Sequence, residues 1–122
     1  MNPLVSVIVP IYNAAPFLKE TLDSIIASTY RPIEIVMVDD GSQDNSINIA
    51  QDYCTNHPEC TVIAQANQGV SVARNNAIRH AKGIYILPVD ADDKIADTFI
   101  QKAVEVIEKN DNIRVVGCRC WM

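Results

Sequence analysis

Three aspartates occur within four residues in the stretch GIYILPVDADD, at residues 83–93. Asp90, Asp92 and Asp93 directly follow an apolar, strand-like segment, at the point where a strand should end. Like charges this close repel each other unless a cation is present or some carboxyls are protonated. A hard divalent ion such as Mg²⁺ or Mn²⁺ would satisfy them, because such ions prefer oxygen ligands. The alternative is a solvated acidic turn that caps the following helix, where Asp is also favoured.

A second pair of carboxylates, Asp39 and Asp40, follows the apolar run IEIVMV at residues 33–38. The pair is followed by Gly41, and Asp-Gly is among the commonest turn dipeptides, so a turn alone would explain it. An ionised carboxylate, however, only accepts hydrogen bonds. One of the two is therefore also a candidate to accept from an N–H group on the edge of a nucleotide base.

The stretch NQGVSVARNNAI, residues 67–78, carries the third signal. Gly69 would allow a close backbone approach, and the N-terminus of the helix that follows would favour an anion. Arg74 could pair with a phosphate through two hydrogen bonds, or it could be a solvated helix residue. For Asn75 and Asn76 the pattern favours neither a functional nor a structural role.

Strands and helices are predicted to alternate along the chain. Near-continuous β-branched runs indicate strands buried on both faces, and apolar stripes at helical spacing indicate helices between them. Ser42 or Asp44 is expected to cap the second helix, and Gly83 to end the third as its C′ residue. The predicted strands are 4–10, 33–38, 61–65, 84–89 and 113–120, and the predicted helices are 14–29, a second through residues 49–54, 69–83 and 96–109.

This alternation predicts βαβ units, and hence an α/β fold of three layers, α/β/α, around a mostly parallel, Rossmann-like sheet. In such sheets ligands bind outside the carboxyl ends of the strands. Tyr12 and Asn13 follow the first strand, and the two groups of aspartates follow the second and the fourth. We therefore expect all of these side chains along one rim of the sheet.

Composition limits the classes of function. The 122 residues suit a single domain, and a 20% charged fraction with 48% hydrophobic residues is typical of a globular chain. A net charge of −5 argues against nucleic acid or an anionic membrane surface as a partner. No apolar run is long enough to span a membrane and no secretory signal is evident, so we expect a cytoplasmic chain. Any membrane association of the full-length protein would depend on other parts.

The cysteines do not have the spacing of a zinc site, and His57 and His80 do not complete one. We expect reduced cysteines that serve packing. They are Cys54, Cys60, Cys118 and Cys120.

Together, the segments VSVIVPIYN, SIIASTYRPIEIVMVDDGSQDNS and NQGVSVARNNAIRHAKGIYILPVDADD resemble the family-2 glycosyltransferases, which have the GT-A fold. The order and spacing of the segments also fit, and the resemblance extends from Val5 to about Ile107. It implies transfer of a sugar from a nucleotide sugar, usually a uridine diphosphate (UDP) sugar, with inversion and with Mg²⁺ or Mn²⁺ as cofactor. The acceptor would be a glycan, a lipid-linked sugar or another hydroxyl compound, as in polysaccharide biosynthesis.

Carried over by position, the resemblance implies that Pro10 and Tyr12 line the base, with Tyr12 stacking on it. Asp40 would accept from the uracil N–H, and Asp39 would support that loop. Asp90-Ala91-Asp92 looks like the D-x-D element of the family, with Asp92 as metal ligand and Asp90 near the ribose, the diphosphate and the metal. Asp93 is a neighbour with a less defined role. The predicted nucleotide-sugar-binding residues are Pro10, Tyr12, Asn13, Asp39, Asp40, Asn67, Gly69, Arg74, Asp90 and Ala91, and the predicted metal ligands are Asp92 and Asp90.

The chain departs from the family pattern in two small ways and in one large way. Ala77 replaces a frequent glycine, and a frequent proline is missing within residues 94–97. Relatives usually continue well beyond this length, and the further part binds the acceptor and supplies the carboxylate that deprotonates the attacking hydroxyl. No residue here is a good candidate for that base. We therefore expect residues 1–122 to be one nucleotide-sugar-binding domain, truncated before the acceptor half, that transfers little or no sugar by itself.

Three other interpretations remain. A phospho-receiver domain also gathers aspartates around Mg²⁺, but a full strand-helix unit precedes the aspartate pair here. A Rossmann dinucleotide-binding domain would need Gly-x-Gly-x-x-Gly after the first strand, where VPIYNAAP stands. A non-catalytic module that binds nucleotide sugars has no counter-evidence in the sequence.

Overall fold

The computed structural model describes residues 2–109. The predicted final strand at 113–120, with Cys118 and Cys120, lies outside these residues. The described elements follow in the order β1 (Val5–Ile11), α1 (Ala15–Ile26), β2 (Ile33–Asp40), α2 (Ser46–Asn56), β3 (Cys60–Gln65), α3 (Val70–His80), β4 (Tyr85–Pro88) and α4 (Phe99–Lys109). This order confirms the predicted alternation of strand and helix.

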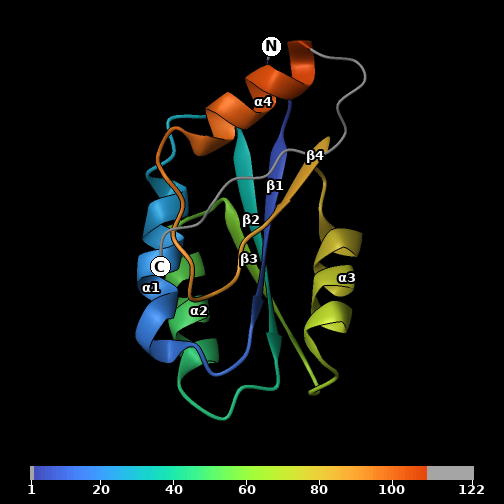
Figure 1. The fold of residues 1–122 in the computed structure, drawn as a ribbon. Coiled ribbons are helices and arrows are strands. Elements are labelled where there is room, and N and C mark those ends of the chain that lie inside the picture. The colour runs from blue at the N-terminus through green and yellow to red at the C-terminus, as the bar shows by residue number, and fades with distance from the viewer. Residues whose placement is uncertain (1, 110–122) are drawn as a thin grey trace.

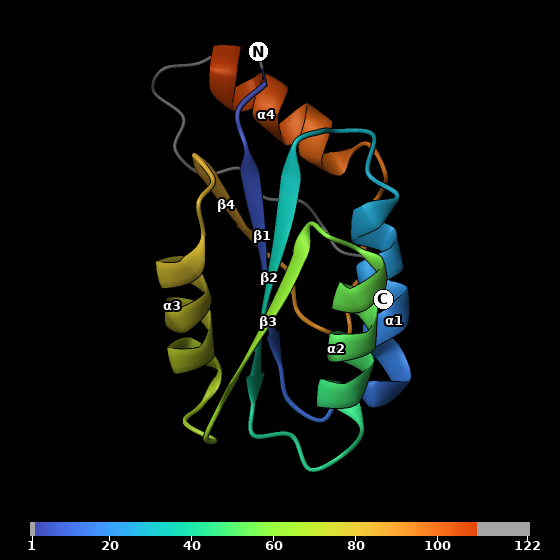
Figure 2. The same ribbon diagram turned by 180° about the vertical axis from the view of Figure 1, so that it is seen from behind.

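The four described strands form one sheet in the order β3-β2-β1-β4, and every pairing is parallel. Helices α1 and α2 cover one face, α3 covers the other, and α4 lies across the amino ends of the strands (Figures 1 and 2). The predicted three-layer α/β/α architecture with a parallel sheet is therefore confirmed. Within residues 2–109, no helix combines the length and the apolar character needed to cross a membrane.

Side chains alternate between the two faces of each strand, and this alternation separates the two aspartates at the end of β2. Ile35 and Met37 belong to the core on the α1 and α2 side, whereas Val36 and Val38 pack with Ala73 and Ala77 of α3. Asp39 continues the first row and Asp40 the second. Only Asp40 therefore faces α3.

The helices bury the faces that their spacing predicts. Leu18, Leu22 and Ile25 of α1 are fully buried, and Ile100 and Val104 anchor α4. Such side chains stabilise the fold by about 1.5–3 kcal/mol each when buried. The expected cap of α2 is only partly right: Asn45 is the N-cap residue, but the Asp44 carboxylate accepts the Ser46 N–H at 2.9 Å, and Ser42 does not contact the helix in this way.

One further boundary differs from the predictions, and one side chain in α3 is exposed. Helix α4 begins at Phe99 and not at residue 96, and Ala96 is exposed. The reason is a tertiary contact, because the Asp97 carbonyl accepts the Thr29 N–H at 2.9 Å beyond the end of α1. In α3, Val70 is half-exposed and not part of the packed face.

The predicted role of Gly83 as a left-handed C′ residue is wrong. Helix α3 ends at His80 and its C-cap residue, Ala81, has an extended backbone. Gly83 instead lies against β1, where its N–H donates to Ser6 Oγ at 2.8 Å. A Cβ atom on Gly83 would lie 2.5 Å from Ser6 Oγ and 2.8 Å from the Leu4 carbonyl oxygen. A glycine is therefore required here, because the backbone at residue 83 lies too close to Leu4 and Ser6 to leave room for a side chain.

We therefore expect Gly83→Ala to lower the free energy of unfolding by about 1–3 kcal/mol, the usual cost of overpacking. The clash involves backbone atoms of β1, which cannot move without disturbing the sheet. Urea unfolding followed by circular dichroism measures the effect. Lys82→Ala is the control, because its side chain is exposed and the substitution keeps the N–H that donates to Glu34. Equal midpoints for Gly83→Ala and Lys82→Ala would contradict the packing argument.

The two described cysteines are free thiols, as predicted. Cys60 is buried, and burial is the main cause that raises its pKa to about 12; Cys54 and Glu59 add to the shift. Burial also raises the pKa of the partly buried Cys54 thiol. Because the thiolate is the reactive form, both behave as packing residues.

Candidate functional site

A cavity of about 240 Å³ opens at the carboxyl end of β1, between the end of β2 and the start of α3. Five predicted nucleotide-sugar-binding residues line it together. They are Pro10, Tyr12, Asp40, Asn67 and Gly69. The half-exposed Tyr12 ring and Val70 side chain leave aromatic and apolar surface free at the cavity. The site is thus a mostly apolar hollow with a carboxylate and an amide at its wall.

Asp40 holds the loop that forms one wall of this cavity. Its Oδ1 accepts from Gln65 Nε2 at 2.9 Å and from the Gln68 N–H at 2.8 Å, and its Oδ2 accepts from the Gly69 N–H at 3.0 Å. Burial alone would raise the pKa of Asp40, but these hydrogen bonds outweigh it and lower the pKa. A carboxylate offers about four acceptor positions, so one remains on Oδ2.

Gly41 and Asn67 complete this wall. Asn67 Nδ2 donates to the Asp40 carbonyl at 3.1 Å. Gly41 has φ +72°, and a Cβ atom there would lie 2.9 Å from the Asn67 nitrogen. The Asp-Gly turn therefore allows the loop after β3 to approach the end of β2 closely.

Asp39 and Asn13 belong to a different network, on the α1 and α2 side of the sheet. Asp39 Oδ2 accepts the Ser42 N–H at 3.1 Å, while its buried Oδ1 has no hydrogen-bond partner among the described residues. Asn13 accepts the Gln43 N–H at 2.8 Å, and its own N–H donates to Ser42 Oγ. The structure thus places Asp39, in β2, and Asn13, in the loop after β1, against the turn that follows β2 and outside the lining of the cavity.

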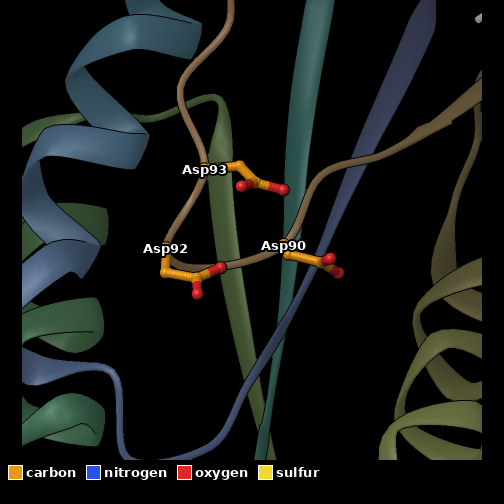
Figure 3. Close-up of side chains that lie close together, drawn as sticks. All are labelled: Asp90, Asp92 and Asp93. Carbon is orange, nitrogen blue, oxygen red and sulfur yellow. The ribbon is translucent and has the colours of Figure 1, made fainter. Parts of the chain in front are cut away.

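The loop between β4 and α4 gathers Asp90, Asp92 and Asp93 (Figure 3). One carboxylate oxygen of each lies within 4.8 Å of one from the other two. Asp90 and Asp92 are exposed, whereas Asp93 is partly buried. Burial, followed by the negative charges of Asp92 and Asp90, raises the pKa of Asp93. Three hard oxygen donors on an open loop fit a divalent cation that keeps several waters, such as Mg²⁺ or Mn²⁺.

Arg74 of α3 forms an ion pair with this carboxylate cluster. It follows Ala73, which lines the cavity, and its Nη2 lies 3.0 Å from Asp90 Oδ1. Its Nε is buried without a hydrogen-bond partner among residues 2–109. The ion pair is partly exposed, so it contributes at most about 1 kcal/mol and can be exchanged for another partner. Arg74, which is predicted to contact a phosphate, thus pairs with an aspartate of the cluster in this structure.

The sequence did not indicate several residues that shape the site. Ile11, Val70 and Ala73 also line the cavity. Gln65 and Gln68 hold the Asp40 carboxylate. The small side chain of Ala73, in the first turn of α3, was the one feature of the sequence that could have indicated the cavity, because it leaves space beside the sheet. Nothing in the sequence distinguished the two glutamines.

Known proteins resemble the chain in sequence and in structure. An uncharacterized glycosyltransferase of Bacillus subtilis, EpsJ, is 46% identical over 118 residues, which are 97% of this chain and 34% of EpsJ. The structure of Staphylococcus aureus TarS 1–349 in complex with UDP-GlcNAc is 30% identical and superposes with a TM-score of 0.82 over 93% of this chain and 37% of that one. The mannosyltransferase PcManGT of Pyrobaculum calidifontis, in complex with GDP-Man and Mn²⁺, is 34% identical with a TM-score of 0.81, over 88% of this chain and 33% of that one.

The chain thus spans about a third of the length of these proteins and shares their GT-A type of fold. The model of the family described as "Glycosyl transferase family 2" matches residues 6–120. This match includes every residue of the cavity and of the carboxylate cluster. The chain therefore belongs to glycosyl transferase family 2.

Proposed function

We propose that this chain binds the donor of an inverting, metal-dependent glycosyltransferase, and that the donor is a UDP sugar. One observation carries the proposal: the cavity lined by Tyr12 and Asp40 extends to Ala73, and the next residue, Arg74, pairs with Asp90 of the carboxylate cluster. A nucleoside diphosphate needs an aromatic and polar pocket at one end and compensation of negative charge at the other. This rim offers both.

The base occupies the cavity in this proposal. The half-exposed Tyr12 ring stacks on it, and Pro10 borders it. The remaining acceptor position on Asp40 Oδ2 takes the uracil N–H. Asn67 and Gly69 line the same wall, so the backbone can approach the nucleotide there. Asp39 and Asn13 support the turn that follows Asp40.

The diphosphate lies towards the carboxylate cluster in this proposal. Asp92, together with Asp90, would hold Mg²⁺ or Mn²⁺, and Asp93 is a neighbour that adds negative charge. A bound ion of this kind supplies charge neutralisation for the departing diphosphate. The Arg74 guanidinium is free to leave Asp90 and to pair with a phosphate oxygen, because the ion pair it makes is weak. Ala91 contributes backbone and no charge.

Transfer of the sugar requires an acceptor as well as a donor. The chain matches about a third of EpsJ, and the acceptor is not defined by the residues described above. We propose that the acceptor is a glycan or a lipid-linked sugar, and that these residues by themselves bind donor without appreciable transfer. A robust transferase activity of this chain alone would contradict the second statement.

Calorimetry with UDP and with GDP, each with and without Mn²⁺, tests the donor proposal. We expect UDP to bind more tightly than GDP, and Mn²⁺ to strengthen the binding of UDP. Equal affinity for the two nucleotides would overturn the assignment of uridine. An affinity for UDP that Mn²⁺ leaves unchanged would overturn the metal site, and no binding of either nucleotide would overturn the donor site.

A further inference from the structure

Helix α1 carries a buried hydroxyl group among the apolar side chains of its packed face. Thr21 is 1% exposed and lies among the buried side chains of Leu18, Leu22 and Ile25. A buried hydroxyl costs free energy unless it makes a hydrogen bond, and valine would fill the same space without that cost. The partner of this hydroxyl therefore explains its presence.

That partner is the backbone between two of the clustered aspartates. Thr21 Oγ1 donates to the Ala91 carbonyl oxygen at 2.8 Å, and the carbonyl of Phe17, one helical turn back, is farther away at 3.3 Å. Ala91 is itself buried, with 6% exposure, and it separates Asp90 from Asp92. The hydroxyl thus fixes the peptide group from which Asp92 projects.

A second hydroxyl of α1 holds the far end of the same segment. Ser24 Oγ accepts the Ile95 N–H at 3.2 Å and donates to the Thr21 carbonyl at 2.7 Å. The segment from Ala91 to Ile95 has no helix or strand, and its own backbone bond is that of the turn, from the Asp93 N–H to the Asp90 carbonyl at 3.0 Å. The exposed ion pair of Lys94 with Glu20 adds little to its order. Two hydroxyls on one helix face therefore anchor the segment at both ends.

We infer that Thr21 is a positioning residue for the divalent cation, acting through the Ala91 carbonyl. The inference rests on the metal site of the proposed function. Mg²⁺ requires near-ideal octahedral geometry, so carboxylates that drift apart bind it less well. Residues that orient metal ligands without touching the metal typically change its affinity by about 10–100-fold. Thr21 meets that description, because its hydroxyl sets the backbone that carries Asp90 and Asp92.

Substitutions at position 21 separate the hydroxyl from packing. Thr21→Val keeps the shape and removes the donor, whereas Thr21→Ser keeps the donor. Thr55→Val is the matched control, because within residues 2–109 the hydrogen bond of the Thr55 hydroxyl is to the Gln51 carbonyl, on the exposed side of α2. UDP binding is measured by calorimetry with and without Mn²⁺. We expect Thr21→Val to reduce the Mn²⁺-dependent gain in affinity about 10-fold and the other two variants to keep it within about 2-fold.

Two readouts without metal show whether the effect is one of positioning. UDP binding without Mn²⁺ should stay unchanged in all three variants, since the cavity does not include position 21. Amide hydrogen exchange over residues 91–95 should be faster in Thr21→Val than in Thr21→Ser. If Thr21→Val does not fold, Ser24→Ala replaces it, because this substitution removes the acceptor of the Ile95 N–H. We then expect the Mn²⁺-dependent gain in UDP affinity to be several-fold smaller than in the unsubstituted chain.

The outcomes are distinguishable. A normal Mn²⁺ effect in folded Thr21→Val, or in the substitute variant Ser24→Ala, would overturn the inference. An equal loss in Thr21→Val and Thr21→Ser would overturn it as well, because packing and not the hydroxyl would then be responsible. If the unsubstituted chain shows no Mn²⁺ effect, the metal site of the proposed function fails, and the inference fails with it.

Discussion

Asp92→Asn should remove the Mn²⁺-dependent part of UDP binding and leave the metal-free part unchanged. The substitution keeps the size of the side chain and removes one negative charge from the carboxylate cluster. A divalent ion loses a charged oxygen ligand as a result. The cavity around Tyr12 does not include Asp92. Calorimetry with UDP at several Mn²⁺ concentrations measures both parts. In a complete transferase the same change should lower kcat by about 10²–10³-fold, the size expected for one preorganised electrostatic group.

Asp97→Asn is the matched control for this substitution. Asp97 lies in the same loop, is exposed and is not part of the cluster, and its described contacts are made by its backbone carbonyl. The Asp97→Asn variant should therefore bind UDP and Mn²⁺ like the unsubstituted chain. If Asp92→Asn retained the full Mn²⁺ effect, the cluster would be a solvated acidic turn and the metal site would have to be sought elsewhere.

Asp40→Ala should have the second large effect, on stability and on the choice of base together. The substitution removes the acceptor of the Gln68 and Gly69 N–H groups and of the Gln65 side chain. Hydrogen bonds to a charged group contribute about 1.5–3 kcal/mol each, but the cost of burying the Asp40 carboxylate offsets a large part of the three bonds together. We therefore expect the free energy of unfolding to fall by about 3 kcal/mol. The preference for UDP over GDP should shrink, because the acceptor for the uracil N–H is lost. Urea unfolding and calorimetry measure the two effects.

The stability effect of Asp40 should depend on pH in a defined direction. Its folded-state pKa lies below the ordinary value of 3.8, because the hydrogen bonds outweigh burial. Its contribution is therefore complete above that value and is lost as the pH falls through the lower, folded-state pKa. The difference in unfolding free energy between the unsubstituted chain and Asp40→Ala should be constant from about pH 5 to 8 and should decrease below about pH 4.

Asp44→Ala provides the comparison. Asp44 also has a lowered pKa, chiefly because the Ser46 hydroxyl donates to it, and it also accepts the Ala15 N–H at 3.1 Å. It does not line the cavity. Loss of stability in both variants, with the base preference changed only in Asp40→Ala, is the expected result. An unchanged base preference in Asp40→Ala would remove Asp40 from the proposed base site.

The amino-acid sequence by itself determined the architecture and the end of the molecule at which the polar residues gather. Buried β-branched runs such as Val5–Ile11 and apolar stripes such as Leu18, Leu22 and Ile25 have a periodicity that local chemistry enforces. Parallel pairing then follows from the alternation of strand and helix, and it places the ends of β1 and β2 at one rim. Composition and spacing were sufficient because each of these features depends on near neighbours in the chain.

Contacts between distant segments were decided only by the tertiary structure. Gly83 is needed because Ser6 lies against it, α4 starts late because Asp97 contacts Thr29, and Arg74 meets Asp90 across the rim. In the sequence Thr21 is one polar residue in a helix, and only the structure shows that it donates to Ala91, 70 positions later in the chain. Hydrogen bonding and close packing depend on the distances between atoms. A periodic pattern in the sequence does not specify which residues, far apart in the chain, come within contact distance.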